Sequence, residues 1–484
     1  MGLFNVVLHF LVRATSVCFL ISLVFIPLSS LAWSELEEEL IKKIEWVLPH
    51  LDEKSRERIK LRLRLAELYA EKARFVGQKE IDTHGVFQKE SNKLRERSLE
   101  LYRDVLPDLS QSLQGTVLIQ MSQLAELNGK VDLAREHLLK ASELAVDLAQ
   151  RGEAFFLLGE LLMRHNQLDQ AERYLVQALN YEQKNQPLVL YRLAMARASQ
   201  GKLDQAIEDF TILLSNKHRI VEERIDQGKE NRKEERDFFA EVINNFVVIL
   251  ARRGNLNYQD INKFLVLVGK DKWSEFLPFL ASEVERLGKW NDLRTIWSYL
   301  IDHADALNPD ENQLLLAHAS LFFVSVVENQ KKVAEEKLRF LSQFFSNIDQ
   351  RACYQSSECR QSHQNIRLAL ARWLDQEKLN PSFELVSTLS YYCDMWREDE
   401  EMQEHWASSL RLQKQHLEAS LVMFQLAQKT INEERKESYL LLALEDAEKG
   451  SDEGWLFDLR NYYLQYAPLK TEYPKVYYQI LKTA

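Results

Sequence analysis

The sequence predicts an all-α protein built from stacked pairs of helices. Its 484 residues include only 14 glycines and 9 prolines. Long stretches rich in Leu, Ala, Glu, Gln, Lys and Arg show no β-branched alternation, which favours helix over strand. Three alanines, Ala134, Ala171 and Ala206, lie in matching frames 37 and 35 residues apart. A period near 34, with a small residue where two helices cross and a large apolar residue one turn later, is typical of an α-solenoid of helical hairpins.

Residues 1–32 are predicted to be a signal peptide. They carry one charge, Arg13, followed by an apolar segment from Val17 to Leu28 and by small residues up to Ala32 that would suit cleavage. The alternative is an uncleaved anchor, because the apolar runs on both sides of Arg13 together approach the roughly 20 residues that cross a bilayer. An arginine inside such a span costs about 2.5–3.5 kcal/mol, which favours cleavage. The sequence lacks an Asn-x-Ser/Thr glycosylation site, so we expect export to a bacterial periplasm.

The exported part is predicted to begin with a helix. Ser34 and Glu37 match a capping box, in which each side chain satisfies a backbone amide at the helix start. The residues expected on its buried stripe are Leu36, Leu40, Ile41, Ile44, Val47 and Leu48.

A first, enlarged repeat is expected next. Helical spacing runs from Leu61 to Phe75, a polar stretch occupies Gly77 to Glu90, and a second helix passes through Leu94 to Leu106. We interpret the polar stretch as a loop inserted into this repeat.

The frames at 115–218 resemble tetratricopeptide (TPR) repeats, in which the first helix carries large, small and large residues and the second carries alanines. The best-matched unit spans about Gly152 to Asn185, and its matching residues are Phe155, Leu158, Gly159, Leu162, Ala171, Leu175 and Ala178. The next unit matches through Leu190, Leu193, Ala194, Gly201, Leu203, Ala206 and Phe210, and a weaker one keeps Leu118, Gly129, Ala134, Leu138 and Ala141. Beyond residue 218 the pattern persists in two fragments, Ala281, Gly288 and Trp297 in one and Ser420, Phe424 and Ala427 in the other.

The chain is therefore expected to contain a TPR-like solenoid at 33–216, a charged connector at 217–236 and a divergent helical-repeat solenoid at 237–484. The connector is dense in both charge signs and poor in apolar residues. In the last region the helices are predicted near 237–252, 258–268, 273–287, 291–303, 311–327, 331–346, 364–376, 382–396, 400–412, 415–430, 435–449, 454–465 and 473–482.

Six tyrosines crowd the C-terminal end. They are Tyr462, Tyr463, Tyr466, Tyr473, Tyr477 and Tyr478. We expect them to cap the last core layer, and the alternative is an aromatic contact patch.

Three cysteines remain once the signal peptide is removed. Cys353 and Cys359 are candidates for a disulfide, which in an oxidising compartment would add roughly 2 kcal/mol. Six helical residues would hold their Cα atoms about 9 Å apart, so the bond requires a non-helical stretch between them. The alternative is two free thiols, while Cys393 is expected in the core.

The sequence contains no catalytic or metal-binding motif that we can identify. It lacks a nucleophile elbow, a zincin motif, a phosphate-binding loop and a cysteine pair at zinc spacing. We therefore expect no enzymatic activity, no cofactor and no metal. A formal charge of −11 also makes nucleic acid an improbable partner.

Binding of proteins or peptides is the function that the TPR resemblance implies. It places the partner-binding groove on the first helices of the three clear units, at Ile119, Gln123, Glu126, Glu153, Phe156, Glu160, Met163, Leu188, Tyr191 and Met195, with Thr116 and Ala198 at its margins. Family members that clamp a C-terminal carboxylate place Lys and Asn there, and this chain does not. We therefore expect an extended or helical segment with apolar and basic character; the alternative is that flanking helices of the chain fill the groove.

The resulting hypothesis is a periplasmic scaffold in a cell-envelope assembly, such as outer-membrane or gliding-motility machinery. The alternative is a non-catalytic regulator, or a peptidoglycan-associated partner, of a cell-wall enzyme. Membrane contact is expected only through the N-terminal segment, if that segment is not cleaved.

Overall fold

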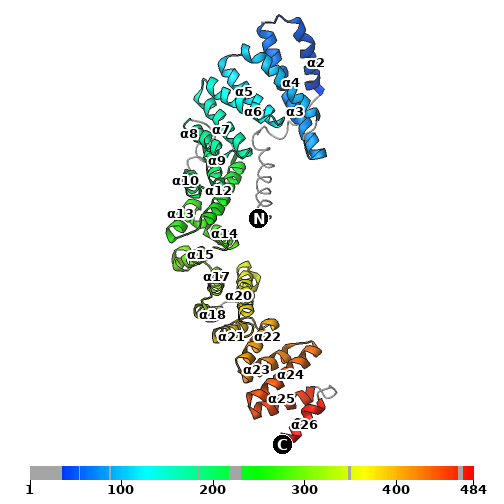
Figure 1. The fold of residues 1–484 in the computed structure, drawn as a ribbon, viewed down its shortest axis with the longest axis vertical. Helices are drawn as coiled ribbons and strands as arrows, with labels where there is room; N and C mark the ends of the chain where they lie inside the picture. Colours follow the sequence, from blue (N-terminus) through cyan, green and yellow to red (C-terminus); the bar gives the residue numbers. More distant parts are fainter. Residues whose placement is uncertain are drawn as a thin grey trace. The chain divides into compact units, whose positions relative to one another are not determined.

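The computed structural model describes residues 35–53, 55–86, 89–181, 186–216, 231–346, 350–466 and 473–483. Every regular element in these ranges is a helix, and consecutive helices pack against each other as pairs (Figure 1). The predicted all-α fold of helical hairpins is therefore confirmed. The predicted signal peptide at 1–32, Ser34 and most of the charged connector lie outside the described residues.

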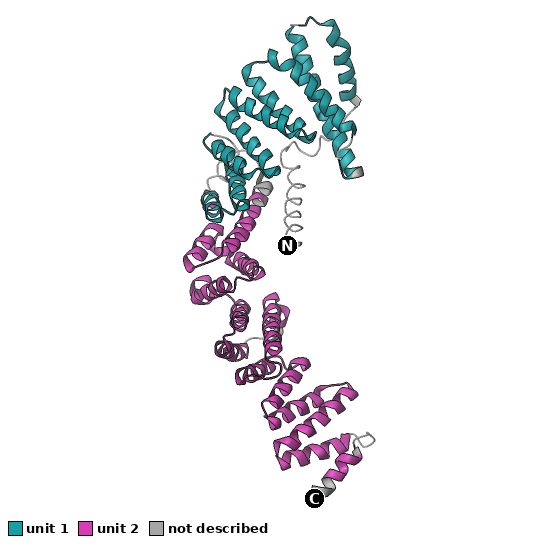
Figure 2. Cartoon of the chain, in the orientation of Figure 1, with its two compact units in different colours: residues 1–213 teal, residues 214–484 magenta. Residues whose placement is uncertain are grey.

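The chain divides into two compact units, residues 1–213 (unit 1) and 214–484 (unit 2), which are described separately (Figure 2). The elements of unit 1 are α2 (Glu35–Val47), η2 (Leu48–His50), α3 (Arg56–His84), α4 (Lys89–Val105), η3 (Leu106–Asp108), α5 (Gln111–Leu127), α6 (Val131–Leu144), α7 (Leu148–Arg164), α8 (Leu168–Leu179), α9 (Gln186–Ser199) and α10 (Leu203–Ser215), the last of which crosses the boundary. Their core is one continuous apolar cluster running from Ile41 to Ala196.

The expected loop in the first repeat is wrong. Helix α3 continues without a break through Gly77 to His84, where Gly85 ends it in a left-handed conformation with φ 75°. A single glycine inside a helix costs only about 1 kcal/mol, and the residues after it are mostly good helix formers. The repeat is therefore enlarged by longer helices.

The predicted stripe of α2 is only partly buried. Ile41 and Ile44 lie in the core, whereas Leu36 and Leu40 are exposed. Helix α3 is the main α-helical neighbour of α2, and it covers only part of the apolar face of α2.

Unit 2 is a second series of helices. Its elements are α12 (Asn231–Arg253), α13 (Tyr258–Val268), η4 (Lys270–Lys272), α14 (Trp273–Arg286), α15 (Trp290–Asp302), α16 (Ala304–Leu307), α17 (Glu311–Val327), α18 (Lys331–Phe345), α19 (Gln350–Gln355), α20 (Ser357–Gln376), α21 (Phe383–Met395), α22 (Glu400–Leu412), α23 (His416–Lys429), α24 (Glu433–Gly450), α25 (Glu453–Tyr466) and α26 (Tyr473–Thr483).

One turn geometry recurs in both units. In six hairpins a residue with φ between 58° and 81° follows the first helix, and the next amide bonds to the carbonyl oxygen five residues back. This pattern is a Schellman turn, which satisfies carbonyl groups at a helix end. The left-handed residues are Gly129, Asn166 and Gly201 in unit 1 and Gly288, Asn329 and Lys414 in unit 2.

A disulfide joins Cys353 and Cys359 in unit 2, with their Cα atoms 5.3 Å apart. Ser356 adopts an extended conformation between α19 and α20, and its hydroxyl accepts a hydrogen bond from the amide of Cys359 at 3.0 Å. This break brings the two cysteines closer than an unbroken helix would allow. Both are fully buried in an apolar cluster that also contains the free cysteine Cys393, and burial raises the pKa of the Cys393 thiol.

Candidate functional site

The predicted groove lies on the first helices of three successive hairpins of unit 1. Helix α7 contacts both α5 and α9, and the second helices α6 and α8 pack between successive first helices (Figure 1). The first helices of successive hairpins therefore lie next to one another in a row.

Polar bonds hold these first helices in register. The Gln150 side chain on α7 donates to the Thr116 hydroxyl on α5 at 2.9 Å. The guanidinium of Arg164, also on α7, donates to both carboxylate oxygens of Glu126 on α5, at 2.7 and 2.8 Å. Bidentate pairs of this kind add geometric specificity as well as energy.

The link between α7 and α9 is a buried ion pair. Glu160 lies 3.0 Å from Arg192 and 3.6 Å from Arg164, measured between oxygen and nitrogen atoms. Burial raises the pKa of Glu160, while both arginines act in the opposite direction. Removing one member of such a pair leaves a buried charge uncompensated, which destabilises the fold strongly.

The expectation that all ten groove residues face a partner needs correction. Ile119, Phe156, Glu160 and Tyr191 are buried in the structure, as is the marginal residue Ala198. Contact between adjacent first helices and with the second helices covers them; Tyr191, for example, packs edge-on against Phe210 of α10 at 6.1 Å between ring centroids. They belong to the core and to the contacts between repeats.

Six of the predicted residues remain accessible, and we call them the α5–α7–α9 surface. Gln123 and Glu153 are exposed, and the other four are partly exposed: Glu126, Met163, Leu188 and Met195. Desolvation by surrounding atoms raises the pKa of Glu153 although its side chain is accessible. The surface combines carboxylates with methionines, which adapt to differently shaped partners. Whether it binds a partner stays a prediction.

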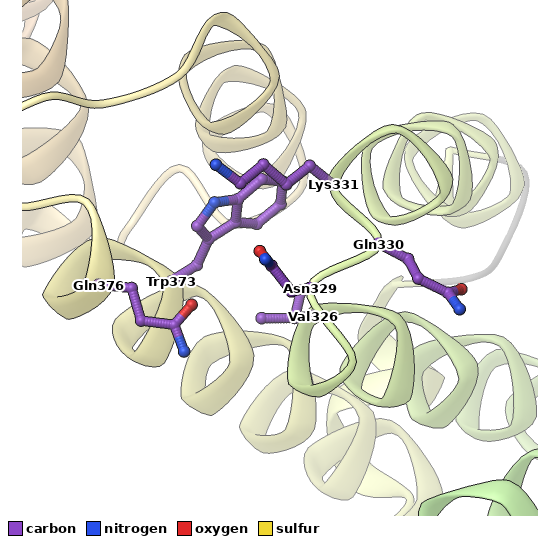
Figure 3. A pocket seen from close by; sticks show the side chains of 6 residues that line it. All are labelled: Val326, Asn329, Gln330, Lys331, Trp373 and Gln376. Atoms are coloured by element: carbon purple, nitrogen blue, oxygen red, sulfur yellow. The ribbon is translucent and has the colours of Figure 1, made fainter.

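A small pocket of unit 2 lies at the turn between α17 and α18. It has an empty volume of about 150 Å³ and is lined by Val326, Asn329, Gln330, Lys331, Trp373 and Gln376. Figure 3 shows the Lys331 side chain extending toward the indole of Trp373, while Gln330 points away. Small-molecule sites typically occupy 300–1,000 Å³, and this pocket has about half the lower limit of that range.

Other chemistry-bearing residues of unit 2 act within the fold. His416 lies 3.5 Å from Asp446, which also pairs with Arg411, so these residues link neighbouring hairpins. Within the described ranges, no group of three His, Cys, Asp or Glu side chains could hold a metal ion. No helix of the described residues is long and apolar enough to span a membrane.

The C-terminal tyrosines are divided between core and surface. Tyr463 is buried, Tyr462 packs edge-on against Phe424 at 5.0 Å, and the ammonium of Lys436 lies 4.6 Å from the ring centre of Tyr466. Tyr477 and Tyr478 are exposed, and the side chain of Tyr473 is outside the described residues. The tyrosines of α25 thus pack as the predicted cap, whereas two on α26 do not.

Comparison with known proteins gives only distant similarities. No family model and no curated protein matches the chain. One similar solved structure is that of Naa15/Naa10 bound to HypK-THB, with a TM-score of 0.27, 12% identity, and coverage of 93% of this chain and 75% of that chain. Another is yeast Tom70, with a TM-score of 0.21, 13% identity, and coverage of 77% of this chain and 73% of that chain. At these TM-scores the similarities carry no argument about family or function.

Proposed function

We propose that the protein is an exported TPR-type scaffold that holds protein partners in the bacterial cell envelope. The observation that carries this proposal is the α5–α7–α9 surface. The Arg164–Glu126 and Arg192–Glu160 pairs fix the three first helices against each other, and five further side chains of mixed chemistry remain accessible beside the partly exposed Glu126. A rigid row of repeats with spare side chains is suited to binding an extended or helical segment.

Export is supported by the pattern at 1–32 and by the disulfide between Cys353 and Cys359. Disulfides persist in oxidising compartments such as the periplasm and are rare in the cytosol. Alkylation of the non-reduced, denatured protein should label Cys393 but neither Cys353 nor Cys359. Labelling of Cys353 and Cys359 without reductant would contradict this support, and fractionation of cells tests the compartment directly.

The function is tested on the accessible residues, since the buried Phe156 and Tyr191 would unfold the protein if replaced by charged residues. We expect Gln123→Lys with Glu153→Lys to lose proteins that co-purify with the unmodified chain from cross-linked envelopes, because the two changes together add positive charge to a surface that carries carboxylates. The matched control is Gln177→Lys with Glu136→Lys, which makes the same replacements at exposed positions on the second helices α8 and α6. Equal sets of co-purified proteins from both variants would contradict the proposal.

The alternative is a regulator, or a peptidoglycan-associated partner, of a cell-wall enzyme. Sedimentation with purified peptidoglycan distinguishes the two: a peptidoglycan-associated partner sediments without added protein, whereas the proposed scaffold does not.

A further inference from the structure

The three first helices α5, α7 and α9 of unit 1 carry charged residues of both signs. The complete set is Glu126, Arg151, Glu153, Glu160, Arg164, Arg192 and Arg197. Four of these residues form the cross-helix pairs described above, Arg164 with Glu126 and Arg192 with Glu160. Because these four charges neutralise each other, they hold the repeats in register and attract a charged partner only weakly.

The other two arginines of these helices are also bound within the protein. The guanidinium of Arg151 donates to the backbone carbonyl oxygens of Ser142 and Ala145 at the end of α6, at 3.1 and 3.2 Å. Arg197 donates to both carboxylate oxygens of Asp209 on α10, at 2.8 and 2.9 Å. Both arginines therefore connect a first helix to a second helix.

Glu153 differs from the other charged residues of α5, α7 and α9. Its carboxylate forms neither a hydrogen bond nor an ion pair with any residue that the structure describes. Surrounding atoms remove part of its water and so raise its pKa, and no neighbouring charge contributes to that shift. A carboxylate that loses water without gaining a cation is less stable than in solution. A cation from a partner would compensate for this loss.

Accessible apolar side chains accompany Glu153 on the α5–α7–α9 surface. Met163 lies on the same helix, and Leu188 and Met195 lie on α9. Glu153 and Met163 are ten residues apart, so they are separated by about 15 Å along the helix axis. A peptide of about a dozen residues is long enough to contact both of them, whether it is helical or extended.

We infer that Glu153 determines the specificity of the α5–α7–α9 surface by binding a basic side chain of the partner segment, whose apolar residues contact the methionines. An arginine suits this role because it can donate two parallel hydrogen bonds to one carboxylate. The inference rests on the scaffold function proposed above. It separates the three carboxylates of these helices by role, since Glu126 and Glu160 hold the repeats together and Glu153 selects the partner.

The probe is obtained by selecting random dodecapeptides, displayed on phage, that bind the full exported chain. We expect the selected peptides to be enriched in basic residues beside apolar ones. The same selection with Glu153→Gln should lose the basic residues. The matched control is Glu143→Gln, which removes an exposed carboxylate from the second helix α6 and should leave the enrichment unchanged.

The tightest selected peptide is then synthesised with a fluorescein label, and each of its basic residues is replaced by glutamine in turn. Fluorescence anisotropy should show about tenfold weaker binding for one of these peptides, and about tenfold weaker binding of the original peptide to Glu153→Gln. The two changes together should weaken binding no more than either change alone, because they remove the same contact. Glu153→Arg should bind the peptide again when glutamate replaces that basic residue.

Selected peptides without basic residues, equal enrichment with Glu153→Gln, or additive losses from the two changes would overturn the inference. The surface itself is tested by Gln123→Lys and Met163→Ser, which leave Glu153 in place. If these two changes weakened binding while Glu153→Gln did not, the surface would still bind partners and only the role of Glu153 would be wrong. Unchanged affinity in all three variants, or a selection without any saturable binder, would count against the proposed function as well.

Discussion

The hairpins of units 1 and 2 share a backbone but differ in the residues that build it. All six Schellman turns have the same hydrogen bond and a left-handed residue. Five residues after that position, unit 1 always has a buried alanine: Ala134, Ala171 and Ala206. The equivalent residues of unit 2 are Leu293, Ala334 and Ala419, which are equally buried.

The residue seven positions before the left-handed residue of each turn also differs between the two units. Unit 1 has Ser122, Gly159 and Ala194 there, whereas unit 2 has Ala281, Phe322 and Ala407. Each hairpin therefore needs complementary volumes on its two helices, and a small residue is one of several ways to provide them. This difference explains why the TPR-like pattern fades beyond residue 218 while the hairpins continue.

The largest expected effect tests the need for a small residue in unit 1. A Cβ atom added at Gly159 would lie 2.6 Å from Cγ of Leu175 on the paired helix. We expect Gly159→Ala to destabilise the α7–α8 hairpin by about 2 kcal/mol through overpacking, although alanine is the better helix former. Hydrogen exchange measured by mass spectrometry should show faster exchange in α7 and α8.

The matched control is Gly454→Ala in α25 of unit 2, where the nearest atom to the new Cβ atom is 3.5 Å away. That change should be neutral or slightly stabilising. If Gly159→Ala behaved in the same way, close packing would not be the reason for glycine at this position.

A smaller effect is expected from pH in unit 2. His318 on α17 packs against Phe340 and Phe344 of α18, with ring centroids 4.7 and 6.2 Å away, and burial lowers its pKa to about 4. Because the unfolded chain binds this proton more tightly, the contribution of His318 to stability is complete above pH 6.5. It is lost as the pH falls from 6.5 to 4, by on the order of 2 kcal/mol.

Denaturant unfolding at a series of pH values measures this loss. His318→Gln should flatten the pH dependence in that window, whereas the exposed His405→Gln should not change it. An unchanged slope for His318→Gln would assign the acid sensitivity to other groups.

The smallest expected effect concerns the left-handed residue of the α22–α23 turn. Lys414 has φ 61°, a conformation that costs a residue with a Cβ atom about 1 kcal/mol or more. We expect Lys414→Gly to stabilise this hairpin by about 0.5–1 kcal/mol and Gly201→Lys to destabilise the α9–α10 hairpin by a similar amount. Hydrogen exchange at the two turns measures both changes, and Lys414→Asn should lie between Lys414 and glycine. Equal stability of the proteins with Lys, Asn and Gly at position 414 would show that the left-handed conformation does not favour glycine there.

Much of the fold could be predicted because helix periodicity depends on local sequence. Most helices of unit 2 begin and end within a few residues of their predicted limits. Helix α20 is an exception, since it begins at Ser357 and not near 364. Its first turn therefore contains Cys359, which is bonded to Cys353. The repeat pattern predicted for α23 is wrong by one residue. Nothing in the sequence marks Lys414 as the left-handed residue of the turn before this helix. The turn places Ala419, Met423 and Leu426, and not Ser420, Phe424 and Ala427, at the repeat positions.

The candidate site was less predictable because its burial depends on neighbouring hairpins. Glu160 occupies a position that faces partners in the resembled family, yet Arg192 from the next hairpin pairs with it. Nothing in the local sequence distinguishes such a pair from two free surface charges. The disulfide candidate, in contrast, was found from the spacing of Cys353 and Cys359 together with the expected export, and the structure joins the two residues.

Bonds between hairpins bridge short sequence distances in both units. Arg164 and Glu126 are 38 residues apart, Arg367 and Asp399 are 32 apart, and Arg411 and Asp446 are 35 apart. A chain held by its two ends under mechanical tension would therefore break these links locally. A released hairpin of about 35 residues would span up to roughly 120 Å when fully extended, while the hairpins on either side of it stay folded.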